Sequence, residues 1–251
     1  DSVSSAWSQL GQDIDGESPY DYSGGSVSLS SDGSIVAIGA AYNDDNGKNS
    51  GHVRVYQIVD DLWTQIGGDI DGEAAEDFSG GSVSLSSDGS VVAIGAYLND
   101  GNGTSSGHVR IYKNVNNTWT QVGSDIDGEA AHDASGASVS LSSDGSVVAI
   151  GAPYNDGNGG HSGHVRIYQN VSGTWIQIGD DIDGVKEWDG LGNSVSLSAD
   201  GSIVAIGATE GDVNGSNSGL VSVYRNLNNK WKKIGEDITG ENVSDYLGFS
   251  V

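Results

Sequence analysis

The chain has 251 residues, with 35 acidic side chains against 10 basic ones, a net charge of −25, and no cysteine or methionine. Nucleic-acid binding is excluded because neutralising phosphates requires clusters of Lys and Arg that the sequence lacks, and the absence of cysteine excludes disulfides, thiol catalysis and thiolate metal sites. No run approaches the roughly 18 apolar residues that a membrane-spanning helix needs.

One sequence unit repeats along the chain at a fixed spacing of 56 residues, and a tryptophan and an Asp-Gly pair mark its copies. The tryptophans are Trp7, Trp63, Trp119, Trp175 and Trp231. Because no insertion interrupts this spacing, the chain is a tandem array of one structural unit.

The array divides into four complete units and two partial ones. Residues 1–24 are predicted to supply the outer strand and trailing loop of a preceding unit, and residues 249–251 begin a further first strand. The complete units lie at residues 25–80, 81–136, 137–192 and 193–248. We therefore expect a segment of a longer or fibrous array, or a protomer whose incomplete end blades are completed by a neighbour through strand addition.

Within one unit, alternating and continuous apolar runs predict four antiparallel strands. In the second unit they lie at residues 82–86, 91–96, 107–112 and 118–122. Between the first two, Asp88-Gly89 is predicted to form a two-residue hairpin turn. The run at residues 91–96 is apolar throughout, which indicates a strand buried on both faces.

Four strands and no helix in 56 residues predict an all-β fold, a β-propeller with one blade per unit. The alternatives are a β-solenoid or a string of separate sandwiches. In a propeller, Val91, Val92 and Ile94 would line the contacts between blades. The recurring tryptophan would anchor one blade on the next.

Several segments resemble the FG-GAP repeats of integrin-α-like propellers. The resemblance rests on GEAAEDFSGGSV, the strand at residues 91–96, IGAPYNDGNGGHSGHVRIY and GENVSDYLGFSV. It implies an extracellular or cell-surface β-propeller used in adhesion or protein recognition, often with bound calcium. The calcium loop of that family lies between the first and second strands. Here that loop is reduced to Ser-Ser-Asp-Gly, too short to surround a calcium ion.

Acidic residues instead gather in two other loops of each unit, both expected on one rim of the propeller. Oxygen ligands of this kind suit Ca²⁺, although Asp and Asn also form ordinary turns. The candidate calcium ligands are Asp44, Asn46, Asp100, Asn102, Asp156, Asn158, Asp212 and Asn214 between the second and third strands, and Asp69, Asp71, Asp125 and Asp127 after the fourth.

Three histidines recur, one per blade, and are therefore too far apart to share one metal ion. They are His52, His108 and His164. The fourth unit has Leu220 at this position, and Ser222 replaces the neighbouring arginine. A residue that leucine replaces is expected to serve packing, not catalysis.

No nucleophile with a matched base is evident, so we expect a protein that is not an enzyme. The leading hypothesis is an extracellular module for adhesion, protein binding or scaffold assembly. The alternative is a carbohydrate-binding propeller that uses exposed aromatic residues, with Trp188, an extra residue in a divergent loop, as the clearest candidate. The other aromatic candidates are Tyr20, Tyr22, Phe78 and Tyr246. Asn116 and Asn170 are the predicted glycosylation sites, in turns on the opposite rim.

Overall fold

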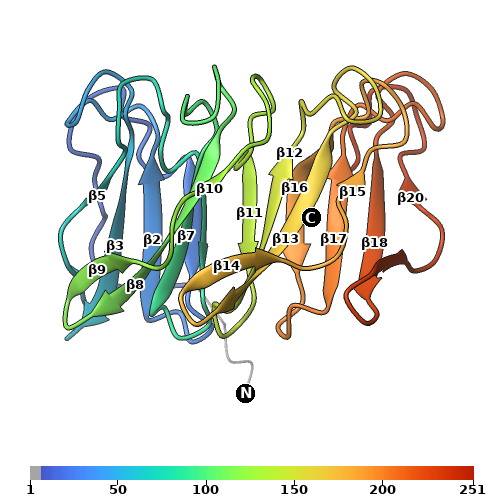
Figure 1. The fold of residues 1–251 in the computed structure, drawn as a ribbon. Coiled ribbons are helices and arrows are strands. Elements are labelled where there is room, and N and C mark those ends of the chain that lie inside the picture. The colour runs from blue at the N-terminus through green and yellow to red at the C-terminus, as the bar shows by residue number, and fades with distance from the viewer. Residues whose placement is uncertain (1–6) are drawn as a thin grey trace.

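A computed structural model describes residues 7–251, which form twenty β-strands and no helix. The strands make four five-stranded sheets that follow one another along the chain (Figure 1). The all-β propeller fold predicted from the sequence is thereby confirmed. The described residues include no helix long and apolar enough to cross a membrane.

Each sheet is one blade, and all four blades have the same strand order. The first blade holds β1 (Ser26–Leu29), β2 (Ile35–Ala40), β3 (His52–Val59), β4 (Leu62–Gln65) and β5 (Ile70–Asp71). The second holds β6 (Ser82–Leu85), β7 (Val91–Ala96), β8 (His108–Val115), β9 (Thr118–Gln121) and β10 (Ile126–Asp127). The third holds β11 (Ser138–Leu141), β12 (Val147–Ala152), β13 (His164–Val171), β14 (Thr174–Gln177) and β15 (Ile182–Asp183). The fourth holds β16 (Leu191–Leu197), β17 (Ile203–Ala208), β18 (Leu220–Asn226), β19 (Trp231–Lys233) and β20 (Ile238–Thr239).

The first four strands of a blade form an antiparallel meander, and the short fifth strand completes the outer edge. In the first blade β4 pairs with the far half of β3, whereas β5 pairs with its beginning, His52 opposite Asp71. The outer edge is therefore one strand interrupted after Gln65. The sequence reading missed the short strand, since its two residues carry no periodic signal of their own.

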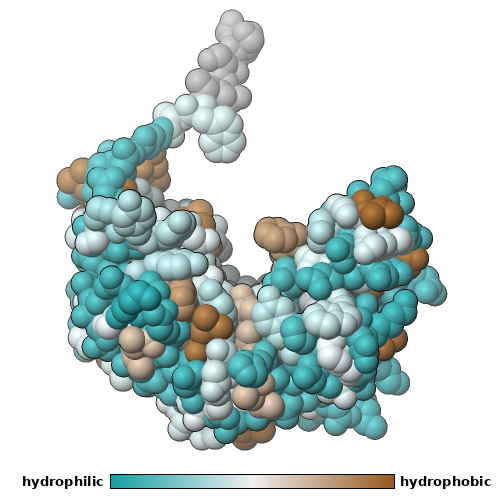
Figure 2. Space-filling model, turned by 90° about the horizontal axis from the view of Figure 1, so that it is seen from above, coloured by the Kyte–Doolittle hydropathy of each residue, from teal (hydrophilic) through white to brown (hydrophobic). Residues whose placement is uncertain are grey.

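The blades stack face to face, and their cores lie between them. Val92 and Ile94 of β7 pack against Val53 and Val55 of the first blade, while Val91 packs toward the third blade. The predicted interblade role of these side chains is therefore confirmed. Stacked in this way, the four blades form an arc that is open on one side (Figure 2).

Hydrogen bonds also join successive blades. The indole Nε1 of Trp119 donates to the main-chain oxygen of Ile66 in the preceding blade at 2.8 Å. Near the inner strands, Ser82 Oγ donates to the oxygen of Gly136 at 2.7 Å. The backbones approach so closely there that a Cβ on Gly95 would lie 2.1 Å from the same Gly136 oxygen. The predicted anchoring role is confirmed for Trp63, Trp119, Trp175 and Trp231, whereas Trp7 is fully exposed and the expectation is wrong there.

The two ends of the arc expose apolar side chains that are buried between the other blades. At the first blade Leu29 is 60% exposed, against 7% for its counterpart Leu85. At the fourth blade Ile238 is 59% exposed, against 6% for its counterpart Ile126.

Two local expectations are wrong. Residues 7–24 form no strand, because an outer strand needs the third strand of its own blade as a partner; residues 1–6 of the predicted segment 1–24 lie outside the described residues. The Asp-Gly pair is not a two-residue turn either. Gly89 N–H donates to the oxygen of Ser86, and Ser86 N–H to that of Val91, which closes a longer loop. Both primed hairpin turns require a positive φ at the first central residue, and here Asp88 does not have it, although Gly89 does.

Candidate functional site

The loops predicted to be acidic lie together on one rim of the arc, the upper one in Figure 1. We call it the loop rim; it consists of the loops between the second and third strands and those that follow the fifth strands. In the second blade, Asn102 Nδ2 donates to the main-chain oxygen of Gly128 at 2.8 Å and so ties the two loops together. Figure 2 looks onto this rim, whose surface is mostly hydrophilic.

The predicted Asp/Asn pairs form hydrogen bonds within these loops. Asp100 Oδ1 accepts the N–H of Ser105 at 2.7 Å, and Asp44, Asp156 and Asp212 accept the equivalent N–H groups at 2.7–2.8 Å. Asn46, Asn158 and Asn214 each donate to the neighbouring loop, as Asn102 does. These hydrogen bonds give the residues a structural role in the loops, and calcium at the pairs remains a prediction.

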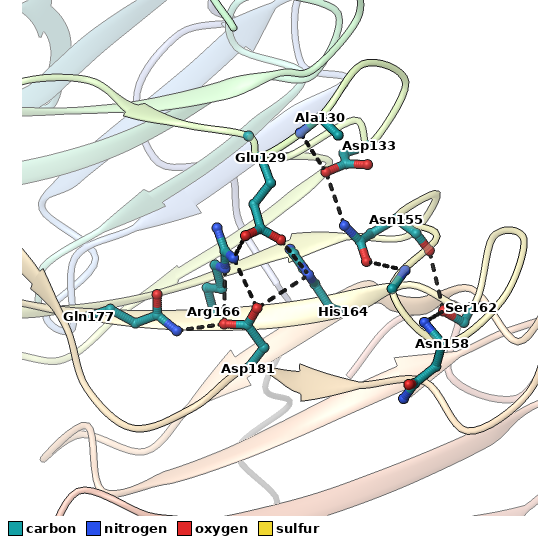
Figure 3. A network of polar contacts seen from close by, with 12 residues as sticks. Glu129, Ala130, Asp133, Asn155, Asn158, Ser162, His164, Arg166, Gln177 and Asp181 are labelled. Atoms are coloured by element: carbon teal, nitrogen blue, oxygen red, sulfur yellow. Dashed lines mark hydrogen bonds and ion pairs between the residues drawn. The ribbon is translucent and has the colours of Figure 1, made fainter. Parts of the chain in front are cut away.

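At each of the first three blades, a buried carboxylate links two loops of the rim. Asp133 is 3% exposed and accepts the N–H of Ala130 at 3.1 Å and the Nδ2 of Asn155 at 3.0 Å (Figure 3). The Oδ1 of Asn155 in turn accepts the N–H of Gly157 in the next loop. This network fixes the loop conformation of the rim.

The predicted acidic residues after the fourth strands have two different surroundings. Asp71 and Asp127 lie on β5 and β10, opposite His52 and His108. Burial and then the neighbouring carboxylate of Asp69 raise the pKa of Asp71. Asp69 and Asp125 instead accept hydrogen bonds from Gln65 and Gln121 and face a cluster of charged residues between the blades.

These interblade clusters combine residues of two consecutive units. In the third cluster, Arg166 of β13 donates from Nε and Nη2 to the carboxylate of Asp181 at 3.0 and 2.9 Å (Figure 3). It also pairs with Glu129, which the second unit contributes. His164 Nδ1 lies 3.8 Å from Glu129 and 3.9 Å from Asp181.

The second cluster has the same residue types with a different arginine contact. Arg110 Nη1 lies 3.3 Å from Glu73, and Nη2 donates to the main-chain oxygen of Asp71 at 2.8 Å. His108 Nδ1 is 3.8 Å from Asp125. The first cluster repeats this arrangement with Arg54, Glu17 and His52.

Burial and the arginines set the charge state of these groups. Burial, followed by the charge of Arg110, lowers the pKa of His108, and burial and Arg166 do the same for His164. Burial opposes ionisation of Asp181, yet hydrogen bonds from Arg166 and Gln177 hold its pKa below the ordinary value. The imidazoles are therefore neutral near pH 7 and the carboxylate is charged.

The fourth interface lacks this charged cluster. Val185, Leu220 and Ser222 occupy the positions of the glutamate, histidine and arginine. Asp237 remains and pairs with Ser222 and with Lys233, which stands where the other units have glutamine. A cavity of about 180 Å³ lies among these side chains.

The histidines alone do not reveal these clusters, because each cluster combines residues that lie far apart in the sequence. The joint replacement of glutamate, histidine and arginine in one unit was the available signal, since residues that change together contact one another.

The aromatic candidates form two groups on the loop rim. Tyr22, Tyr42, Phe78 and Tyr97 stand in a row with ring centroids 4.8, 5.0 and 5.7 Å apart. Separately, Trp188 stacks near His161 at 4.5 Å and is 57% exposed. Tyr20 and Tyr246 are also exposed, whereas Phe78 is buried, so its predicted exposure is wrong.

The two predicted glycosylation sites differ in position. Asn116 lies exposed in the turn between β8 and β9, with a positive φ. Asn170 lies within β13, and its Oδ1 accepts the N–H of Gly173 at 2.9 Å.

Two segments of the chain match the sequence profile of the FG-GAP repeat, residues 14–56 and 70–112. The first matched segment begins before the first blade and the second begins in β5, and each ends in the third strand of a blade. Each thus contains both the glutamate and the histidine of one interblade cluster.

Similar solved structures share the fold at low sequence identity. A periplasmic gluconolactonase from Pseudomonas aeruginosa has 15% identity and a TM-score of 0.56, with 87% of this chain and 57% of that chain covered. A candidate 6-phosphogluconolactonase from Bacteroides uniformis has 12% identity and a TM-score of 0.56, with 85% and 54% covered. Hydrazine synthase from Kuenenia stuttgartiensis has 12% identity and a TM-score of 0.55, with 93% and 53% covered.

The chain therefore spans about half the length of these structures. No curated protein sequence matches it.

Proposed function

We propose that this chain, which contains FG-GAP repeats and has a β-propeller fold, acts outside the cell as a non-enzymatic module that binds a basic protein partner through its loop rim. The observation that carries this proposal is the aromatic row formed by Tyr22, Tyr42, Phe78 and Tyr97. FG-GAP repeats are typical of extracellular proteins, which supports the location.

The aromatic row breaks the symmetry of the repeat. Phe78 is replaced by Ala134 and Gly190 in the next two units, so the row exists at the first two blades alone among the described residues. Tyr22 is 65% and Tyr42 41% exposed, and a pocket of about 180 Å³ lies between them and Tyr97. Exposed tyrosines supply large contact areas at protein interfaces.

Charge indicates the kind of partner. The net charge of −25 and the carboxylates of the loop rim would attract a basic surface and speed its association. Such steering weakens as salt screens it. A basic protein partner is therefore a better fit than an acidic one.

Catalysis is not part of the proposal. The lactonases among the similar structures are too distant in sequence to lend this chain their reaction, because a shared fold does not imply a shared activity. The most deeply buried carboxylates of the rim, such as Asp77 and Asp133, are occupied by hydrogen bonds from loop groups.

Assembly with further blades is a second part of the proposal. The exposed apolar faces around Leu29 and Ile238 match faces that are buried between other blades. We propose that further blades of the same kind cover them, in the same molecule or in a neighbour.

Calcium is proposed only for the free carboxylate oxygens of the rim. Ca²⁺ added to chelator-treated protein would then raise the melting temperature by mass action. An unchanged melting temperature would refute calcium binding.

The binding proposal is tested with biolayer interferometry against a panel of basic extracellular proteins, beside a glycan array. Binding should fall with added salt and be lost in the double variant Tyr22→Ala/Tyr42→Ala. The control is Leu62→Ala, which removes an exposed apolar side chain at the start of β4, beside the turn on the opposite rim. Protein binding that survives the double variant would refute the assigned surface.

A carbohydrate-binding function is the second candidate, because Trp188 and Tyr154 flank His161 in an exposed group. Sugars stack on such faces. Glycan-array binding that is abolished by Trp188→Ala, with no protein binding, would favour this function.

A further inference from the structure

The first interblade cluster has one more carboxylate than the others. Glu17, Asp45, His52 and Asp69 each offer a ligand atom, and these atoms all lie within 4.8 Å of one another. The second and third clusters offer three such groups, because their units have glycine at the position of Asp45.

A buried nitrogen points into this cluster without a partner. His52 is 1% exposed, and its Nδ1 finds no hydrogen-bond partner among residues 7–251. The same atom lies 3.8 Å from Oε2 of Glu17, too far for a hydrogen bond. A buried polar atom left unpaired destabilises the fold, so a group that satisfies this nitrogen would stabilise it.

The net charge of the cluster is negative enough to bind a dication. The two carboxylate oxygens of Glu17 have different partners: Oε1 lies 3.3 Å from Arg54, while Oε2 faces His52. Three carboxylates and one guanidinium sum to −3 + 1 = −2. In the third cluster, by contrast, the arginine binds both carboxylates itself.

We propose that Glu17, Asp45, His52 and Asp69 bind a divalent transition-metal ion of the zinc class. One imidazole nitrogen and three carboxylate oxygens form a ligand set that Zn²⁺ accepts in four-coordinate geometry. Calcium is a poorer fit, because it takes six to eight oxygen ligands. The site joins residues 10–24 to the first blade, so the ion stabilises that contact.

The test is calorimetric titration of the chelator-treated full chain with Zn²⁺, and with Co²⁺ as a spectroscopic probe. The wild type should bind one equivalent with high affinity, and Co²⁺ should give a visible ligand-field absorption band. Asp45→Gly, which restores the residue of the second and third units, should weaken binding at least about tenfold, since even outer-shell changes have effects of that size. His52→Leu, the residue of the fourth unit, should abolish the absorption band.

The matched control is Asp60→Asn, which removes one negative charge from the turn on the opposite rim and should leave the affinity unchanged. Equal Zn²⁺ affinity in wild type and Asp45→Gly, or Ca²⁺ that displaces Zn²⁺ at equal concentration, would overturn the proposal. So would the absence of stoichiometric binding to the wild type. Asp45→Gly decides the matter even if His52→Leu fails to fold, because its loop sequence already occurs in two folded blades.

Discussion

The charged cluster between the first and second blades is predicted to act as one unit that can be replaced only as a whole. Arg110→Ser alone removes the hydrogen bond to the main-chain oxygen of Asp71 and the ion pair with Glu73. Arg110 is 6% exposed, so the hydrogen bond of its charged group is shielded from water. Its loss costs about 1.5–3 kcal/mol.

The ion pair adds less, because the Glu73 side chain is 48% exposed and screened by water. An exposed pair contributes about 0–1 kcal/mol, so Arg110→Ser should lower the free energy of unfolding by about 1.5–4 kcal/mol in total.

The quadruple variant E73V/H108L/R110S/Q121K copies the fourth interface, where Val185, Leu220, Ser222 and Lys233 occupy these positions. Breaking a buried charged network is costly because a partner is left unpaired, whereas replacing the network as a whole is often neutral; here the lysine gives Asp125 the partner that Asp237 has in the fourth interface. We therefore expect its stability to lie within about 1 kcal/mol of the wild type.

Urea unfolding, followed by tryptophan fluorescence, measures the stability of both variants. Hydrogen exchange of the β8 amides locates the effect, because repeat arrays unfold locally as well as globally. A quadruple variant as unstable as Arg110→Ser would refute the reasoning.

Further predictions concern packing and pH. Gly95→Ala should destabilise the protein by about 1–3 kcal/mol or more in urea unfolding, because its Cβ would meet a main-chain oxygen at 2.1 Å. The control is Gly68→Ala, which should change little because a Cβ there would meet no described atom within 4 Å. Trp119→Phe should cost about 1 kcal/mol in the same assay through the lost indole hydrogen bond; an unchanged urea midpoint would contradict this. Hydrogen bonds from Ser198 and Ser202 lower the pKa of Asp200 from 3.8 to about 2, so its stabilising effect is present above pH 3.8 and is lost as the pH falls toward 2; carboxyl NMR titration checks the value. Because burial lowers the pKa of His108 below 6.5, protonation favours the unfolded chain, and stability should fall as the pH drops below 6.5; a flat urea midpoint between pH 8 and pH 5 would contradict it.

The fold was predictable because the same apolar pattern and the same marker residues recur every 56 residues. The apolar run at residues 91–96 identified a strand buried on both faces, and six buried residues occupy it. The fixed spacing of the tryptophans indicated equivalent positions in stacked blades. The two-residue strands such as β5 were not predictable, since pairing with β3 alone defines them.

The candidate site was only partly predictable, because its contacts cross from one unit to the next. Asp44 and Asn46 were identified as rim residues, but their hydrogen bonds depend on the loop geometry. Glu17 lies 35 residues before His52 in sequence, and only the stacking of the first blade on residues 10–24 brings them together.

The most direct test of this account is a crystal structure grown with Zn²⁺ and measured at the zinc absorption edge. We predict four stacked sheets in an open arc, with an anomalous peak between Glu17, Asp45 and His52. Sheets that do not stack would contradict the account, and so would a peak on the Asp44/Asn46 loop in place of this cluster.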